Sequence, residues 1–212
     1  MPSFDHPAFE AEIARSPYRL RFELSDGGAS TSDAIPYVPM FTRAFDRARV
    51  LFDATFATSS QVLAIVGAWP NPGSAALGKD RNGDRVRDGF ESLHNMGLPS
   101  FDIVAEWSGR PFCAQHRSKE KWRHRALNIT SDNLSRDIML WSNLAADLGI
   151  RPVAPVSIAF IDPSRGIFLH PYDDRGMDVI AVEKDVLEPL RRDHDEWILE
   201  YDRARIEKAF AS

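Results

Sequence analysis

The stretch GIFLHPYDDRGMDVIA, residues 166–181, decides the fold. Two apolar runs that alternate with polar residues, Ile167 to His170 and Met177 to Val182, flank the charged tetrad Asp173 to Gly176. Alternation is typical of half-buried strands, and an Asp-Asp-Arg-Gly sequence between two such runs indicates a hairpin turn. The stretch therefore predicts two antiparallel strands joined by a tight corner.

A third strand precedes this hairpin. The run Val156 to Ile161 is apolar, and Asp162 to Gly166 supplies the residues of a turn, so the three strands form an antiparallel meander. Period-two or doubly apolar patterns predict further strands at Arg19 to Leu24, Gln61 to Trp69, Phe101 to Trp107 and Lys121 to Ile129. Gln61 to Trp69 is apolar on both faces, which favours a central position.

Helical periodicity marks the layers that cover these strands. Apolar residues recur at steps of three and four over Met40 to Ala57 and over Leu134 to Leu148, where Ser131 or Asp132 can cap the start. Shorter helices are predicted before Ser16, over Val186 to Ile198, and over Arg203 to Phe210 with Asp202 as its cap. The pattern predicts one α+β domain over residues 1–212, with a mixed, largely antiparallel sheet of about six strands flanked by helices.

Composition sets the class of protein. The chain has 212 residues, of which 43% are hydrophobic, enough for a core, and its lone cysteine, Cys113, excludes an intrachain disulfide. No export signal opens the sequence, and the longest apolar runs fall far short of the roughly 20 residues that span a membrane. We expect a cytoplasmic protein with no membrane partner and read Cys113 as buried filler.

Charge is unevenly distributed along the chain. Residues 172–208 carry twelve acidic side chains against seven basic ones, whereas residues 79–125 carry ten basic against seven acidic. An acidic surface repels nucleic acid and attracts basic protein surfaces. On the predicted strand, Lys119, Lys121, Arg123 and Arg125 share one face, which can follow a phosphate backbone or pair with the chain's own carboxylates. We favour the pairing, so nucleic acid is an unlikely partner.

The tetrad at residues 173–176 has two interpretations. In the structural one, Asp173 and Asp174 begin the turn, Arg175 pairs with either of them, and Gly176 supplies a positive φ. In the functional one, His170, Asp173, Asp174 and Asp178 form an acidic site for a divalent cation. Strand alternation argues against the second, because His170 and Asp178 lie on separate strands and neighbouring strand residues face opposite ways.

The same residues carry a family resemblance. The stretch IFLHPYDDRGMDVIA, followed by an acidic helix and Trp197 to Asp202, resembles the C-terminal signature of the bacterial domain-of-unknown-function 3885 family. The YDDRG element stands here as Tyr172, Asp173, Asp174, Arg175 and Gly176. The resemblance implies a bacterial, soluble, single-domain protein and leaves the function open. From the functional interpretation of the turn, we take His170, Tyr172 to Arg175, and Asp178 as the candidate partner-binding or functional residues.

Two weaker motifs point to metals. Asp80 to Glu91 spaces its oxygen-bearing side chains as a calcium loop does, but Arg85 occupies the position of the required glycine and the arginines repel a cation. Cys113 and His116 are spaced like two metal ligands but lack a second pair. We predict neither a metal nor a cofactor.

Signatures of the common enzyme classes are missing: there is no P-loop, dinucleotide fingerprint, nucleophile elbow or zinc-binding histidine pair. The leading hypothesis is a non-catalytic protein-binding module of a bacterial cytosol, for instance an immunity protein that covers the active site of a toxin. The alternative is a metal-assisted hydrolase or nuclease that uses His170, Asp173, Asp174 and Asp178. A third possibility is nucleic-acid binding through the basic strand.

Overall fold

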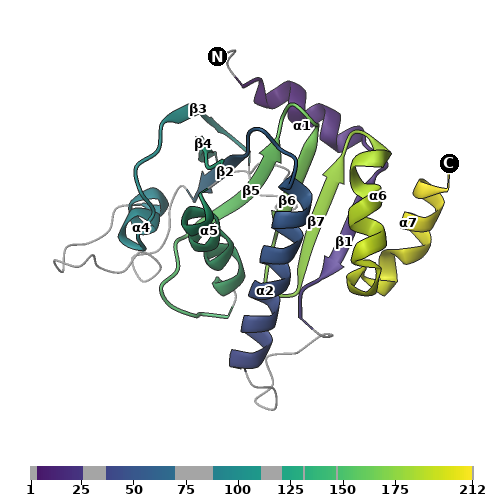
Figure 1. The fold of residues 1–212 in the computed structure, drawn as a ribbon. Coiled ribbons are helices and arrows are strands. Elements are labelled where there is room, and N and C mark those ends of the chain that lie inside the picture. Colours follow the sequence, from purple (N-terminus) through teal and green to yellow (C-terminus); the bar gives the residue numbers. More distant parts are fainter. Residues whose placement is uncertain are drawn as a thin grey trace.

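The fold comes from a computed structural model, which describes residues 4–25, 37–69, 88–110, 121–130, 132–146 and 148–211 (Figure 1). These residues form one sheet with helices on both of its faces, an α+β fold as the sequence predicts. The expected loop at 70–78, most of Asp80 to Glu91, and Cys113 with His116 lie outside the described residues.

The sheet has seven strands in the order β1-β7-β6-β5-β2-β4-β3, and each pairing among the described residues is antiparallel. The predicted meander is confirmed as β5 (Val156–Asp162), β6 (Ile167–Pro171) and β7 (Gly176–Ala181). Strand β1 (Arg19–Glu23) pairs with β7 and forms one edge, and β3 (Ile103–Gly109) forms the other.

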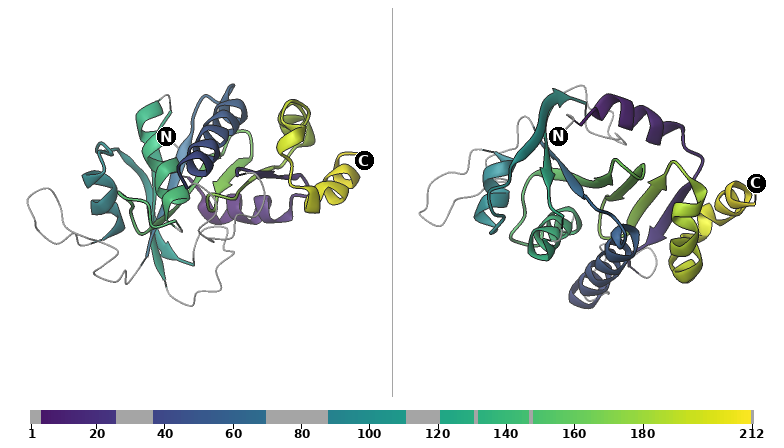
Figure 2. Two further views of the ribbon diagram at one scale, coloured as in Figure 1. Left: turned by 90° about the horizontal axis from the view of Figure 1, so that it is seen from below. Right: turned by 45° about the horizontal axis from the view of Figure 1, so that its top comes forward.

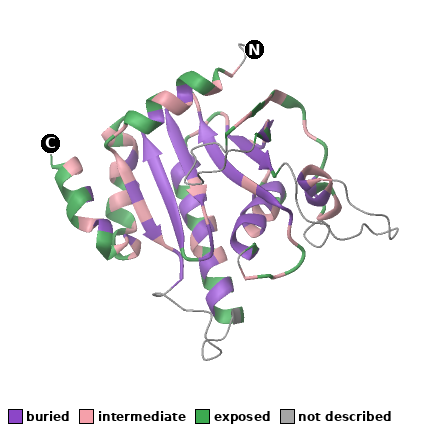
Figure 3. Ribbon diagram, turned by 180° about the vertical axis from the view of Figure 1, so that it is seen from behind, coloured by how far each residue is buried: buried purple, intermediate pink, exposed green. Residues whose placement is uncertain are grey.

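Strand β2 (Leu63–Ala68) lies inside the sheet, between β5 and β4 (Trp122–Asn128). All six of its residues are buried, which agrees with a sequence that is apolar on both faces. Figure 3 shows how burial is concentrated in the inner strands.

Helices cover the two faces unequally. On one face α2 (Tyr37–Phe56), α5 (Asn133–Ala145) and α6 (Lys184–Asp193) bury their apolar stripes in the larger part of the core. On the other face α1 (His6–Arg15) contributes Phe9 and Ile13 to a smaller cluster with Ile65, Phe168 and Ile180. Figure 2 shows α1 across the sheet from α2 and α5.

Two elements differ from the sequence prediction. Helix α4 (Gly89–Asn95) was not expected, and it begins where Asp88 accepts a hydrogen bond from the amide of Glu91 at 3.0 Å. The helix expected over Val186 to Ile198 ends at Asp193, and the short 3-10 helices η1 (Asp195–Trp197) and η2 (Glu200–Asp202) lead into α7 (Arg203–Phe210).

This break in the helix protects an edge of the sheet. Between η1 and η2 the chain runs beside β1, where Ile198 forms a bridge with Phe22 and the amide of Leu199 donates to the carbonyl of Arg21 at 2.8 Å. Covering an edge strand removes a template for unwanted pairing. If α6 continued as a helix past Asp193, the backbone of Ile198 and Leu199 could not pair with β1.

A buried amide joins α5 to the meander. Asn143 Nδ2 donates to the carbonyls of Ile158 (2.6 Å) and Pro171 (2.7 Å), and its Oδ1 accepts from the amide of Ile158 at 3.0 Å. Pro171 has no N–H to donate to β5. The side chain of Asn143 therefore completes the hydrogen bonding of β5 and β6 where their ladder ends.

The turn before β6 matches its prediction. Asp162 accepts from the amides of Ser164 (2.9 Å) and Arg165 (3.2 Å), and Gly166 has φ +60°, a conformation that favours glycine.

Across the described helices, none combines the length and the apolar composition needed to cross a membrane.

Candidate functional site

The YDDRG corner connects β6 to β7, and Asp173 shapes it. Its Oδ1 accepts from the amides of Arg175 (2.8 Å) and Gly176 (3.1 Å), and its Oδ2 accepts from Nε of Arg175 at 2.9 Å. Asp173 is 4% exposed, so its carboxylate is used inside the turn. The predicted pairing of Arg175 with an aspartate is confirmed.

The role predicted for Gly176 was wrong, because its φ is not positive. Glycine is required there for space. A Cβ on Gly176 would collide with Oη and Cζ of Tyr172, whose amide also donates to the Gly176 carbonyl at 3.2 Å. The corner thus depends on the close approach of an aromatic ring to the backbone of β7.

The other carboxylate on this side, Asp178, holds an arginine of the edge strand. Arg21 and Asp178 are cross-strand partners, and the guanidinium donates to both carboxylate oxygens at 2.8 and 3.2 Å. This pairing raises the pKa of Arg21, so the cation is permanent. Arg21 also lies 3.3 Å from Asp202, which in turn contacts Arg205 at 3.2 Å.

Asp202 was expected to cap α7, but its side chain makes no capping hydrogen bond. Its carboxylate instead lies between Arg21 and Arg205 and is 7% exposed. The competing interaction with two guanidinium groups is stronger than a hydrogen bond to a helical amide.

Tyr172 lies beside the same arginine. The centre of its ring is 5.9 Å from Cζ of Arg21, a distance suited to a cation-π contact. Burial raises the pKa of Tyr172 to about 12, and the nearby charge of Asp178 adds to the shift. The phenol therefore stays protonated and neutral at physiological pH.

His170 lies on the same face as Asp178, because the two are register partners on β6 and β7. Alternation along the strands had suggested that they face apart, but residues directly opposite in a ladder share a face. The imidazole is 3.4 Å from Oγ of Ser157. Asp174 is buried at 5% exposure.

The six candidate side chains of the sequence analysis do not surround a common cation site. They belong to His170, Tyr172, Asp173, Asp174, Arg175 and Asp178. Asp173 is used by the turn and Asp178 by Arg21, and no group of three or more His, Cys, Asp or Glu side chains in the described part of the chain is placed to hold a metal ion. The arrangement is a buried hydrogen-bonded corner that fixes β7 against β6 and β1.

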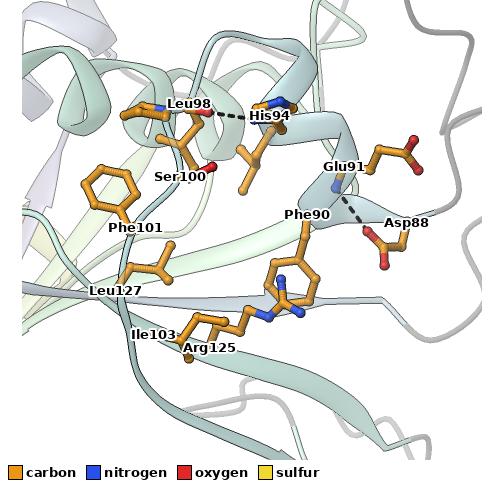
Figure 4. A pocket seen from close by; sticks show the side chains of 12 residues that line it. Asp88, Phe90, Glu91, His94, Leu98, Ser100, Phe101, Ile103, Arg125 and Leu127 are labelled. Atoms are coloured by element: carbon orange, nitrogen blue, oxygen red, sulfur yellow. Dashed lines mark hydrogen bonds between the residues drawn. The ribbon is translucent and has the colours of Figure 1, made fainter.

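The basic strand face is partly neutralised, as the charge pattern suggested. Arg123 pairs with Asp88, Arg125 pairs with Glu106 at 2.7 Å, and both guanidinium groups lie over the ring of Phe90 at 5.0 and 4.3 Å. Of these residues, Asp88, Phe90 and Arg125 line a pocket of about 400 Å³ between α4 and the sheet (Figure 4). Asp88, a member of the suspected calcium loop, caps α4 instead.

The acidic surface lies elsewhere than the YDDRG corner. Asp173, Asp174, Asp178 and Asp202 are buried, whereas the exposed carboxylates of the C-terminal third are on or beside α6, η1, η2 and α7: Glu183, Asp185, Asp193, Asp195, Glu196, Glu200 and Glu207. The negative charge exposed on this third of the chain therefore comes from this second group.

Comparison with known proteins identifies a family. The sequence profile of a family described as a domain of unknown function, DUF3885, matches residues 5–202. The chain belongs to the DUF3885 family. No curated protein and no solved structure matches it significantly.

In this DUF3885 chain the match covers every strand of the sheet and the YDDRG corner. Sequence reasoning found the corner but missed Arg21 and Arg205, which surround the buried carboxylates. Alternation placed Arg21 on the polar face of β1, yet only the register of β1 with β7 brings it to Asp178.

Proposed function

We propose that the protein is a non-catalytic module that binds another protein through the corner formed by η1 and η2. Tyr201 carries this proposal: it is 90% exposed, the most exposed of the large hydrophobic side chains among the described residues. Exposed tyrosines on fixed backbone are typical hot spots of interfaces, because they offer a large contact area at a low entropic cost.

The backbone that carries Tyr201 is braced on two sides. Arg203 donates to Asp195 of η1 at 3.0 and 3.1 Å and to Glu200 of η2 at 3.0 Å. On the other side, the Leu199 amide bonds to Arg21 of β1. A corner held in this way needs little ordering when a partner binds, which favours affinity.

Charge suggests the kind of partner. The side chain of Glu196, which is exposed in η1, makes no ion pair or hydrogen bond with a described residue, and the exposed side chains of Glu183 and Asp185 at the start of α6 share this property. Such a surface attracts a basic protein. A toxin domain with a phosphate-binding cleft is basic, so an immunity protein is the specific form of the proposal.

The experiment places a photo-crosslinking residue, p-benzoylphenylalanine, at position 201 in the cell that makes the protein. Leu134, 66% exposed on α5, is the control position for the same replacement. The proposal expects one adduct of defined mass from position 201 and none from 134. Adducts at neither position, or the same adducts at both, contradict it.

The identity of the captured protein tests the immunity form. A toxin domain whose activity falls when the module is added supports it, and Glu196→Gln should slow association most at low salt, since exposed charges act on the encounter rate. A captured metabolic enzyme, or a gene neighbourhood without a toxin, counts against the immunity role while the binding function stands.

A further inference from the structure

A cleft with basic walls lies on the edge of the sheet that carries β1. It has a volume of about 730 Å³, within the range of small-molecule sites, and lies between the end of α1, β1 and α7. Four of its lining side chains are cations: Arg19 and Arg21 from β1, and Arg205 and Lys208 from α7. In a chain of net charge −5 such a concentration is unexpected.

The spacing along the two elements explains how these cations meet. Arg19 and Arg21 are two apart on a strand and share its polar face, while Arg205 and Lys208 are three apart on a helix and share one side of it. The guanidinium of Arg205 also approaches the carbonyl of Arg19 at 3.4 Å, which ties α7 to the edge strand.

Buried carboxylates orient two of the cations without neutralising the cleft. Asp178 and Asp202 hold Arg21, and Asp202 also holds Arg205. Arg19 and Lys208 have no ion pair or side-chain hydrogen bond with any described residue. Four cations against these two carboxylates leave a net charge of two positive units.

We propose that this cleft binds a small molecule that carries a phosphate group. A phosphate monoester has a charge of about −1.5 to −2 at neutral pH, which matches the excess, and guanidinium groups donate to phosphate oxygens in pairs. A long polyanion is disfavoured, because the exposed carboxylate of Glu207 lies on α7 itself and that of Glu200 lies in η2, just before α7.

Calorimetry on the full chain tests the proposal with inorganic pyrophosphate and adenosine 5′-monophosphate as probes, and with sulfate and oligothymidylate as competing anions. We expect at least one phosphate probe to bind more tightly than sulfate. Arg19→Ala and Lys208→Ala should each weaken it about fivefold or more, with a larger loss in the double variant. Since neither side chain pairs with any described residue, the variants should keep the wild-type melting temperature.

Arg192→Ala is the matched control, because Arg192 is an exposed cation of α6 outside the cleft. It should leave the affinity unchanged. The proposal is overturned if neither phosphate binds at millimolar concentration, if the double variant binds as the wild type does, or if sulfate binds equally well. Tighter binding of oligothymidylate would assign the cleft to nucleic acid and also overturn it.

Discussion

The ring of Tyr172 lies so close to Gly176 that it overlaps the space of a side chain at position 176. Oη and Cζ of the ring occupy the space of a Cβ, while the backbone of the two residues is joined by a hydrogen bond of 3.2 Å. The glycine of the YDDRG element is thus a packing requirement of the tyrosine that opens it.

Gly176→Ala should therefore destabilise the protein by about 1–3 kcal/mol, since the added methyl group overpacks against the Tyr172 ring and forces the ring or the backbone to shift. Urea unfolding measures the change. In a Tyr172→Ala background the same substitution should cost less than about 1 kcal/mol, because the two residues are in contact. Gly109→Ala, where the nearest atom is 3.7 Å from the added Cβ, is the control. Equal costs in both backgrounds would show that the contact is not the cause.

Asn143 offers a second test, of the link between α5 and the meander. Asn143→Leu leaves the Ile158 amide and the carbonyls of Ile158 and Pro171 buried without these partners, and each such group costs about 1–3 kcal/mol. We expect a loss of at least about 3 kcal/mol in unfolding free energy. Asn133→Leu, at the exposed first turn of the same helix, should change stability by less than about 0.5 kcal/mol. A small loss at position 143 would mean that water replaces the amide.

The elements could be predicted because their patterns are local. The meander, the doubly apolar β2 and the stripes of α2 and α5 each fit one period over a short window, and all were found within about three residues of their ends. Helix α4 is too short for a periodic signal, and the break after Asp193 depends on pairing with β1 rather than on the sequence around it.

The candidate site was predictable only in part. Sequence spacing located the YDDRG turn and the pairing of Arg175, but the contacts of Arg21 with Asp178 and Asp202 join residues 157 positions apart or more. Which carboxylates are buried depends on such long-range register. The sequence therefore placed the docking surface at the YDDRG turn, whereas we propose it at η1 and η2. Both segments are acidic.

Divalent cations test the hydrolase alternative directly. Because the carboxylates of Asp173 and Asp178 are already used by Arg175 and Arg21, we expect calorimetric titration with magnesium, manganese or calcium to give no micromolar binding. Asp174→Asn should behave as the wild type does. Micromolar binding that this substitution abolishes would instead favour metal-assisted chemistry at the YDDRG corner.

His124 makes the stability depend on pH. His124 is 1% exposed, its Nε2 lies 2.9 Å from the carbonyl of Arg110, and its Nδ1 has no hydrogen-bond partner among the described residues. Nε2 therefore carries the proton of the neutral ring, and a second proton on Nδ1 would be buried without an acceptor among the described residues. Burial accordingly lowers the pKa of His124 below its ordinary 6.5, and a coulombic contribution from His6 acts in the same direction.

The fit of this ring is tight on both sides. Trp107 stacks on His124 with centroids 5.2 Å apart, and His6 stacks on the same indole at 4.1 Å. A Cβ on Gly67 would lie 2.9 Å from the imidazole. The ring cannot turn Nδ1 toward solvent without disturbing these neighbours, so protonation must be resisted by the fold.

The sign of the effect follows from linkage. The pKa of His124 in the folded state lies below the unfolded value of 6.5, so the unfolded chain binds more protons at pH values between these two pKa values. The contribution of His124 to the free energy of unfolding is therefore fully present above pH 6.5 and is lost as the pH decreases from 6.5 through the folded-state pKa. Between pH 7.5 and pH 5.5, the free energy of unfolding measured with urea should fall less for His124→Gln than for the wild type. Glutamine does not titrate, and its side chain can still donate to the carbonyl of Arg110. An NMR titration of His124 Hε1 with a midpoint at or above 6.5 would contradict this account.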